Sequence, residues 1–327
     1  MVSTVRNNQI VNLLILLPYT LIVRAHSLLY PKVYEVSSDD SILSRWILSM
    51  LGENALFHSI LSALLIYCVA VIVANLSNKY RIFQKQNLYG AFFFVLLASL
   101  IAEVQMLTPA LLGLLFFTLY LKSCMTIYRY HFKEFEIFNV GLFAMLAGLV
   151  YPPLMMLLFA SLFVILFFEG VDTKAFLLLI LGMVSTAIIV LSLFYFFDLY
   201  TFSDEGTLGL SKVITGKTYW VWDRIFYCGV VFFWVLFGLA KFYSFQKKKI
   251  IDARKRISFL ALLTILLVII PFFFIGSDIH FLLILSLMAS FSIALYFDSL
   301  KNNIIVEMIH LLLIITLFGF QFNWINI

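Results

Sequence analysis

Residues 24–53 read RAHSLLYPKVYEVSSDDSILSRWILSMLGE and form the longest polar interruption in the first 200 residues of the chain. Apolar residues in the second half recur at helical spacing, which predicts an amphipathic helix over about residues 40–51. Ser38 or Asp39 is placed to cap its start, and Gly52 is placed to end it. A dozen residues reach ~18 Å, less than the ~30 Å hydrocarbon core of a bilayer. We therefore expect this helix to lie along a membrane surface and not to cross it.

The two faces of this helix follow from the spacing of its side chains. The apolar face is predicted to consist of Ile42, Leu43, Trp46, Ile47 and Met50. The opposite face is predicted to consist of Ser41, Ser44, Arg45 and Ser49. Leu48 is the exception, because its position places an apolar side chain on the polar face.

The composition predicts an all-α, polytopic helical membrane protein. The chain has 327 residues, of which 64% are hydrophobic and 12% are charged, and its mean hydropathy is +1.07. Soluble domains carry about 25% charged residues. The net charge of +5 comes from short loops between apolar segments, which argues against binding to nucleic acid. We expect one membrane domain over residues 1–327, and no disulfides, because the three cysteines lie in or beside apolar segments.

About eleven segments are apolar enough to be membrane helices. Their predicted bounds are 10–29, 54–76, 88–105, 108–127, 137–150, 153–168, 175–199, 222–241, 257–275, 281–297 and 304–323. The fifth and sixth segments are shorter than the ~20 residues of a usual span. Pro152 and Pro153 separate them, which predicts a helix hairpin with a tight turn.

Lysine and arginine are distributed unevenly between the loops that these spans define. They are concentrated in every second loop, above all in the basic loop at residues 242–256, and are sparse in the loops at residues 30–53 and 200–221. Cytoplasmic loops of membrane proteins carry an excess of positive charge. We therefore predict a bacterial inner-membrane protein with a cytoplasmic N-terminus, these two sparse loops outside, and a periplasmic C-terminus.

Acidic residues show the opposite distribution. Those on the predicted outer side are Glu35, Asp39, Asp40, Glu53, Glu103, Asp198, Asp204, Glu205, Asp223 and Asp278. Two explanations stay open: the outer loops need polar residues of some kind, or a functional site lies at the outer face.

Three of these carboxylates are candidate catalytic residues. Asp39 and Asp40 can cap the amphipathic helix and interact with its dipole, or one of them can act as a general base at the membrane surface. Glu103 lies near the outer end of the third predicted span. It can mark the membrane interface or belong to a functional site, because a carboxylate at the membrane boundary is a functional candidate.

Two arginines are candidate ligands of a lipid phosphate. Arg24 and Arg224 lie at the outer ends of predicted spans. An arginine in this position often extends its side chain to the lipid headgroups, and Arg224 can instead pair with Asp223. The alternative is a clamp for a lipid phosphate, for which a planar guanidinium is well suited.

The sequence predicts no metal and no cofactor. Glu307 and His310 share one face of the last span, but a di-iron bundle needs further carboxylates on facing apolar helices, which are absent. His26, His58 and His280 lie at outer helix ends without the spacing of a metal site. A divalent metal is compatible with the acidic residues but is not indicated. P-loop, GxSxG, HExxH and CxxC motifs are all absent.

Three segments carry a resemblance: IVANLSNKYRIFQKQN at residues 72–87, AFFFVLLASLIAE at residues 91–103 and IFNVGLFAMLAGLVYPP at residues 137–153. They resemble an uncharacterised, domain-of-unknown-function family of polytopic inner-membrane proteins from Bacteroidetes-type bacteria. The resemblance covers roughly residues 8–170, and the C-terminal half is generic. It implies a membrane location and little chemistry.

A looser likeness is architectural. Residues 24–110 are similar in layout to GT-C-type membrane glycosyltransferases, which have a first helix followed by an outer loop with surface-parallel helices and an acidic catalytic residue. The likeness implies Asp39 or Asp40 as the base, Glu103 as a second acid or a metal partner, and Arg24 or Arg224 as the phosphate ligand.

Three functions are therefore considered. The first is a GT-C-like glycosyltransferase that uses a polyprenyl-phosphate-linked sugar at the outer face. The second is a non-catalytic membrane subunit or scaffold of an envelope machine, with envelope proteins as partners. The third is a permease or flippase, which requires polar residues within the membrane or broken helices around a central path.

Overall fold

The computed structural model describes residues 10–37, 40–83, 87–100, 102–128, 133–168, 172–199, 251–274, 279–299 and 303–322, together with residues 229, 233 and 236. Over these residues the secondary structure is helical, without strands, which confirms the all-α class. The predicted outer loop at 200–221, and all but three residues of the predicted span at 222–241, lie outside the described part of the chain.

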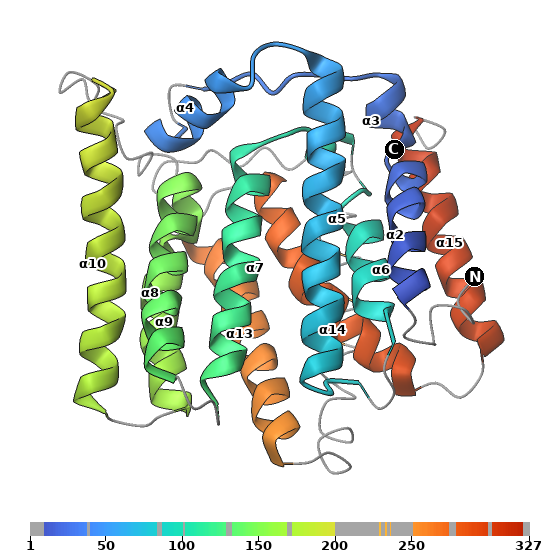
Figure 1. The fold of residues 1–327 in the computed structure, drawn as a ribbon. Helices are drawn as coiled ribbons and strands as arrows, with labels where there is room; N and C mark the ends of the chain where they lie inside the picture. The colour runs from blue at the N-terminus through green and yellow to red at the C-terminus, as the bar shows by residue number, and fades with distance from the viewer. Residues whose placement is uncertain are drawn as a thin grey trace.

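The long helices run side by side, with α10 at one edge of the molecule and α2 and α15 at the other (Figure 1). The elements are α2 (Ile10–Val23), α3 (Ala25–Leu29), α4 (Ile42–Met50), α5 (Ala55–Lys79), α6 (Tyr89–Leu97), η1 (Ala102–Gln105), α7 (Pro109–Ile127), α8 (Lys133–Val150), η2 (Pro152–Met155), α9 (Met156–Phe168), α10 (Thr173–Phe196), α13 (Ile251–Phe274), η3 (Ile279–Phe281), α14 (Leu282–Ser299) and α15 (Asn303–Gln321).

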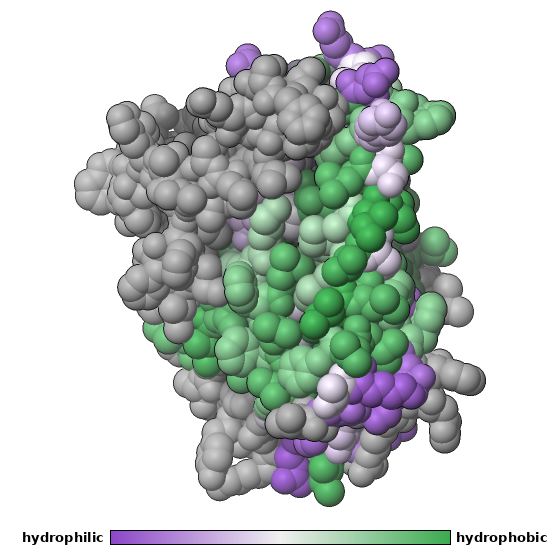
Figure 2. Space-filling model, turned by 90° about the vertical axis from the view of Figure 1, so that its left-hand side faces the viewer, coloured by the Kyte–Doolittle hydropathy of each residue, from purple (hydrophilic) through white to green (hydrophobic). Residues whose placement is uncertain are grey.

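Three described helices, α5, α7 and α10, are long and apolar enough to cross a membrane, judged by length and composition. Shorter apolar helices lie at Leu13–Val23, Pro152–Phe168, Leu282–Asp298 and Val306–Gly319. Figure 2 shows a broad apolar surface on the α10 side, with hydrophilic residues gathered toward its ends, as expected for a surface in contact with lipid. These features indicate membrane association, but they do not confirm eleven spans.

Two predicted spans are interrupted in the structure. The segment at 10–29 divides at Arg24 into α2 and α3, and the segment at 88–105 divides into α6 and η1. The nine residues of α6 reach only ~13.5 Å, about half of a hydrocarbon core. All nine are buried, because α2, α5, α14 and α15 surround the helix. A periodicity of apolar residues shows where a helix can form, but it does not show where the helix stops.

The helix predicted at residues 40–51 is α4, and it lies at an angle across one end of the long helices (Figure 1). Its cap is Ser41, whose hydroxyl accepts a hydrogen bond from the Ser44 amide; the predicted caps were Ser38 or Asp39. Ser41 also donates to the Val150 carbonyl at 2.9 Å, which ties α4 to the end of α8. Gly52 follows the helix with a φ of 72°, as its predicted role at the helix end requires.

The buried face of α4 differs from the predicted one. Ser44 and Leu48, which were expected on the polar face, are buried, whereas Met50 is 63% exposed. Trp46 is half-buried and packs against the Phe197 ring, beyond the end of α10. The helix therefore fits between α8 and the end of α10, and its contacts are not restricted to one flat side.

The predicted hairpin at 137–168 is present as α8, η2 and α9. The five residues from Tyr151 to Met155 reverse the chain, with Pro152 and Pro153 in the 3-10 turn. Gly148 allows the close approach, because a Cβ atom there would meet Cα of Met155 at 3.1 Å. The two short helices pack against each other and do not form one long broken span.

Candidate functional site

The most unusual cluster of buried polar residues lies at the end of α6, a helix that stops before the end of the bundle. Residues 98–100 are buried but not helical, so their backbone polar groups need partners that a continuous helix would have supplied. Arg24, between α2 and α3, lies close to this break, and its side chain is fully buried. The carbonyl end of η1 lies beside it.

Arg24 bonds to two backbone carbonyls from different elements. Its Nη1 donates to the Ser62 carbonyl of α5 at 3.0 Å, and its Nη2 donates to the Gln105 carbonyl of η1. No described carboxylate forms an ion pair with Arg24. The residue follows the apolar segment Leu13–Val23, and an arginine side chain keeps its positive charge in proteins.

Two glutamines complete a polar cluster around the broken segment. The side-chain amides of Gln105 and Gln321 both donate to the Ser99 carbonyl at 2.8 Å. The Gln321 amide also donates to the Val23 carbonyl at 3.0 Å, so the last residue of α15 joins the end of α2 to the broken segment. We call Arg24, Ser62, Ser99, Gln105 and Gln321 the Arg24 cluster.

Four atoms of the Arg24 cluster are buried without a hydrogen-bond partner among the described residues. They are Arg24 Nε, Ser99 Oγ, Gln105 Oε1 and Gln321 Oε1. Buried polar atoms are almost always paired, because each unpaired one costs about 1–3 kcal/mol. The Nε–H group needs an acceptor, and the amide oxygens need donors. A group that offers both an anionic oxygen and a hydroxyl would match this set.

Asp40 is the second predicted site residue that the structure describes fully. It is 6% exposed and lies directly before Ser41, the cap of α4. Its carboxylate accepts hydrogen bonds from the Tyr34 hydroxyl at 3.1 Å and from the Ser37 amide at 2.8 Å. The His280 ring of η3 packs edge-on against Tyr34, with ring centroids 5.6 Å apart. Asp40 therefore anchors the loop before α4. Tyr34, which bonds to its carboxylate, is in turn packed against His280.

The other predicted site residues are only partly described. Asp39 and Arg224 lie outside the described residues. The backbone of Glu103 belongs to η1, two residues before Gln105, but its side chain is outside the described part of the structure. Arg24 and Asp40 do not bond to each other. Arg24 directly precedes α3 and Asp40 precedes the cap of α4, and these two helices lie at the same end of the bundle (Figure 1).

The histidines at the outer helix ends contact different partners. His26 packs against Tyr30 and Phe322, whereas His58 bonds through Nε2 to the Gly52 carbonyl at 2.7 Å. Burial, with the charge of Lys32, lowers the pKa of His26, which favours its neutral form at pH 7. Among the described residues no group of three metal-ligating side chains comes together.

The sequence of the chain matches the profile of a protein family. The profile of a family described as "Family of unknown function (DUF6427)" matches residues 41–327. The chain belongs to this family. A search of curated proteins and a search of solved structures returned no match.

Membership of the DUF6427 family confirms the predicted likeness to an uncharacterised family and corrects its extent. The resemblance was expected over residues 8–170, with a generic C-terminal half, but the family profile begins at residue 41, after Arg24, and continues to residue 327. The C-terminal helices α13, α14 and α15 therefore carry family character as well. Gln321 at the end of α15, which closes the Arg24 cluster, lies in this part of the chain.

Sequence reasoning did not find most of the Arg24 cluster. Gln105 and Gln321 are polar residues in or beside apolar segments, and this was the signal that a search for carboxylates and histidines overlooked. Tyr34 and His280 were equally hard to select, because they lie far apart in the sequence and meet only in the fold. Ser62 is one of many serines and carries no signal of its own.

Proposed function

We propose that the protein is a membrane transferase that acts on a polyprenyl-phosphate-linked sugar at the α4 end of the bundle. The observation that carries this proposal is the guanidinium of Arg24, which is buried, has no described carboxylate partner and has an unpaired Nε–H group, and which is positively charged like other arginines. A buried charge without an opposite charge is costly, so an anionic ligand would stabilise it strongly.

The unpaired atoms of the Arg24 cluster match the chemistry of a sugar phosphate. A phosphate oxygen accepts from the guanidinium, which is the usual partner of phosphate in proteins. Sugar hydroxyls can donate to the unpaired oxygens of Gln105 and Gln321, which no other described group satisfies. The apolar surface around the bundle suits the polyprenyl chain that remains in the membrane.

Asp40 is the proposed general base. In the transfer step the acceptor hydroxyl attacks the anomeric carbon of the sugar, its proton passes to Asp40, and the bond to the phosphate breaks so that polyprenyl phosphate leaves. Tyr34 and the Ser37 amide hold the carboxylate in place through their hydrogen bonds. Asp39, Glu103 and Arg224 remain candidates for the same site, as a second acid or a second phosphate ligand.

The first prediction concerns lipid retention. Arg24→Met keeps an unbranched, flexible side chain but removes the guanidinium and its charge, and we expect it to abolish co-purification of a polyprenyl-phosphate lipid, measured by native mass spectrometry in mild detergent. Arg45→Met is the matched control, because Arg45 of α4 also has a buried, unpaired Nε but is half-exposed. Equal lipid retention in both variants and in the wild type would remove Arg24 from the site.

The second prediction concerns turnover. Asp40→Asn should reduce release of polyprenyl phosphate from a polyprenyl-phosphate hexose by about 100-fold or more, because general-base catalysis contributes ~10²–10⁴. Lipid retention should stay at the wild-type level. Glu53→Gln, an exposed carboxylate after the end of α4, is the control and should keep full activity. Full activity of Asp40→Asn would assign the residue to loop anchoring alone.

A permease or flippase is the second candidate, and the break after α6 favours it. Transporters form their substrate sites from discontinuous membrane helices whose unwound backbone is enclosed by protein. The buried segment at 98–100 has this character. Reconstituted protein that moves a polyprenyl-phosphate sugar across vesicles without cleaving it would favour this candidate. A stable protein partner retained on purification would instead favour the scaffold.

A further inference from the structure

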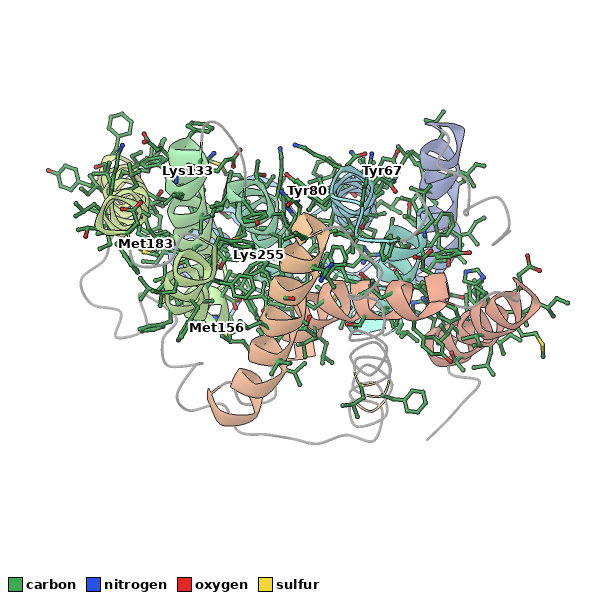
Figure 3. The ribbon with its side chains drawn as sticks, turned by 90° about the horizontal axis from the view of Figure 1, so that it is seen from below. Tyr67, Tyr80, Lys133, Met156, Met183 and Lys255 are labelled. Carbon is green, nitrogen blue, oxygen red and sulfur yellow. The ribbon has the colours of Figure 1, made fainter. Side chains whose placement is uncertain are left out.

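A second basic site lies at the opposite end of the bundle from α4. The C-terminal ends of α5 and α7 meet there with the beginning of α13. Figure 3 views the molecule from this end, with Tyr80 and Lys255 near its middle and Lys133 apart from them on α8. The Tyr80 hydroxyl bonds to Thr126 of α7 at 3.0 Å, which fixes the two helix ends relative to each other.

Arg256 of α13 forms the fixed centre of this site. Its Nε donates to the Met125 carbonyl at 2.8 Å and its Nη2 donates to the Tyr128 carbonyl at 2.9 Å, so it caps the last turn of α7. Its guanidinium lies 4.3 Å from the centre of the Tyr80 ring. The side chain is 9% exposed and holds a positive charge at a defined position between three helices.

Two lysines place their ammonium groups over the rings of Tyr80 and Tyr128. Lys255 Nζ lies 4.5 Å from the centre of the Tyr128 ring, and Lys79 Nζ lies 5.3 Å from the centre of the Tyr80 ring. No described carboxylate forms an ion pair with either lysine. By contrast, Lys174 at the same end pairs with Glu134. The described acidic residue closest in sequence to Lys255 is Asp252.

We propose that Lys79, Lys255 and Arg256 bind the phosphate of an anionic phospholipid at this end of the bundle. Their ammonium and guanidinium groups converge from α5 and α13, and basic pockets between membrane helices bind such headgroups. The tyrosines orient the cations and place an aromatic group at the level of the headgroups. This site is independent of the Arg24 cluster, which lies at the other end of α5.

The test uses delipidated full-length protein in detergent, titrated with phosphatidylglycerol or with phosphatidylcholine, and counts bound lipids by native mass spectrometry. The site variant is Lys79→Gln with Lys255→Gln. The control variant is Lys133→Gln with Lys174→Gln, which removes two charges from the beginnings of α8 and α10, two helices that do not carry Tyr80 or Tyr128. Gel filtration establishes that both variants stay folded.

A basic residue near an anionic surface contributes about fivefold in affinity, so the site variant should bind phosphatidylglycerol about 25-fold more weakly. The control variant should stay within about twofold of the wild type, and phosphatidylcholine binding should be the same in all three proteins. Equal weakening in both variants would show a general surface potential and overturn the proposal. An unchanged site variant, or equal affinity of the wild type for the two lipids, would overturn it as well.

Discussion

Gly182→Val is expected to separate α10 from α8 and to lower the thermal stability of the protein strongly. A Cβ atom at Gly182 would lie 2.3 Å from the Phe138 carbonyl oxygen, and a Cβ atom at Gly141 would lie 2.2 Å from the Leu179 carbonyl oxygen. Both obstacles are backbone atoms of the facing helix, which cannot rotate away. Relief therefore requires the two helices to move apart.

This separation is costly because α8 supplies nearly all the packing of α10 among the described elements, so no other helix can hold α10 in place. Most residues of α10 are not buried, and those that are buried depend on this one contact. In a membrane, helix association depends on close packing between small residues, since the lipid is as apolar as the side chains. Overpacking in a core costs about 1–3 kcal/mol, and we expect at least the upper end of that range here.

The measurement is thermal unfolding of the purified protein in detergent. Gly141→Val should behave like Gly182→Val, because the two glycines face each other across one contact. Gly229→Val is the control, since a Cβ atom at that position would meet no described atom within 4 Å. Unchanged melting temperatures for Gly141→Val and Gly182→Val would mean that the two helices do not pack as closely as the structure shows.

Local features of the fold were predictable from sequence, and features that depend on distant residues were not. The hairpin at Pro152 and Pro153 and the helix end at Gly52 are determined by backbone geometry within a few residues. The end of α6 at Leu97 has no such signal, because an apolar sequence continues past it. Its unwound backbone is satisfied by residues remote in sequence, including Gln321 of α15.

The candidate site likewise combines features that were predictable from the local sequence with features that depend on distant residues. The position of Arg24 at the end of the first apolar helix was visible in sequence, and its burial among backbone carbonyls was not, because they come from α5 and η1. The position of Asp40 at the start of α4 was predictable, but its anchoring by Tyr34 depends on how the preceding loop folds back. The face of α4 was misassigned because α8 and Phe197 contact it from more than one side.

Arg24→Met should also separate the structural role of the arginine from its proposed role in binding. Neither carbonyl that Arg24 contacts depends on it alone. The Ser62 carbonyl lies inside α5, where the helix supplies a backbone donor, and the Ser62 hydroxyl lies 3.0 Å from the Gln105 carbonyl and can donate to it. Removal of the guanidinium therefore leaves neither carbonyl unpaired, and it removes a buried charge that has no described carboxylate beside it.

We accordingly expect Arg24→Met to be as stable as the wild type in lipid-free detergent, or more stable by about 1–4 kcal/mol, the range found when buried ion pairs are replaced by well-packed apolar residues. Added polyprenyl phosphate should then stabilise only the wild type, by about 2.7 kcal/mol at a hundred times its dissociation constant. Thermal unfolding with and without this lipid measures both effects, with Arg45→Met as the control. A variant that is less stable than the wild type in the absence of lipid would make Arg24 a structural residue. In a binding site, the Arg24 charge should lower the stability of the protein without ligand and raise the stability of the protein with a bound anion. A structural role alone does not produce both results.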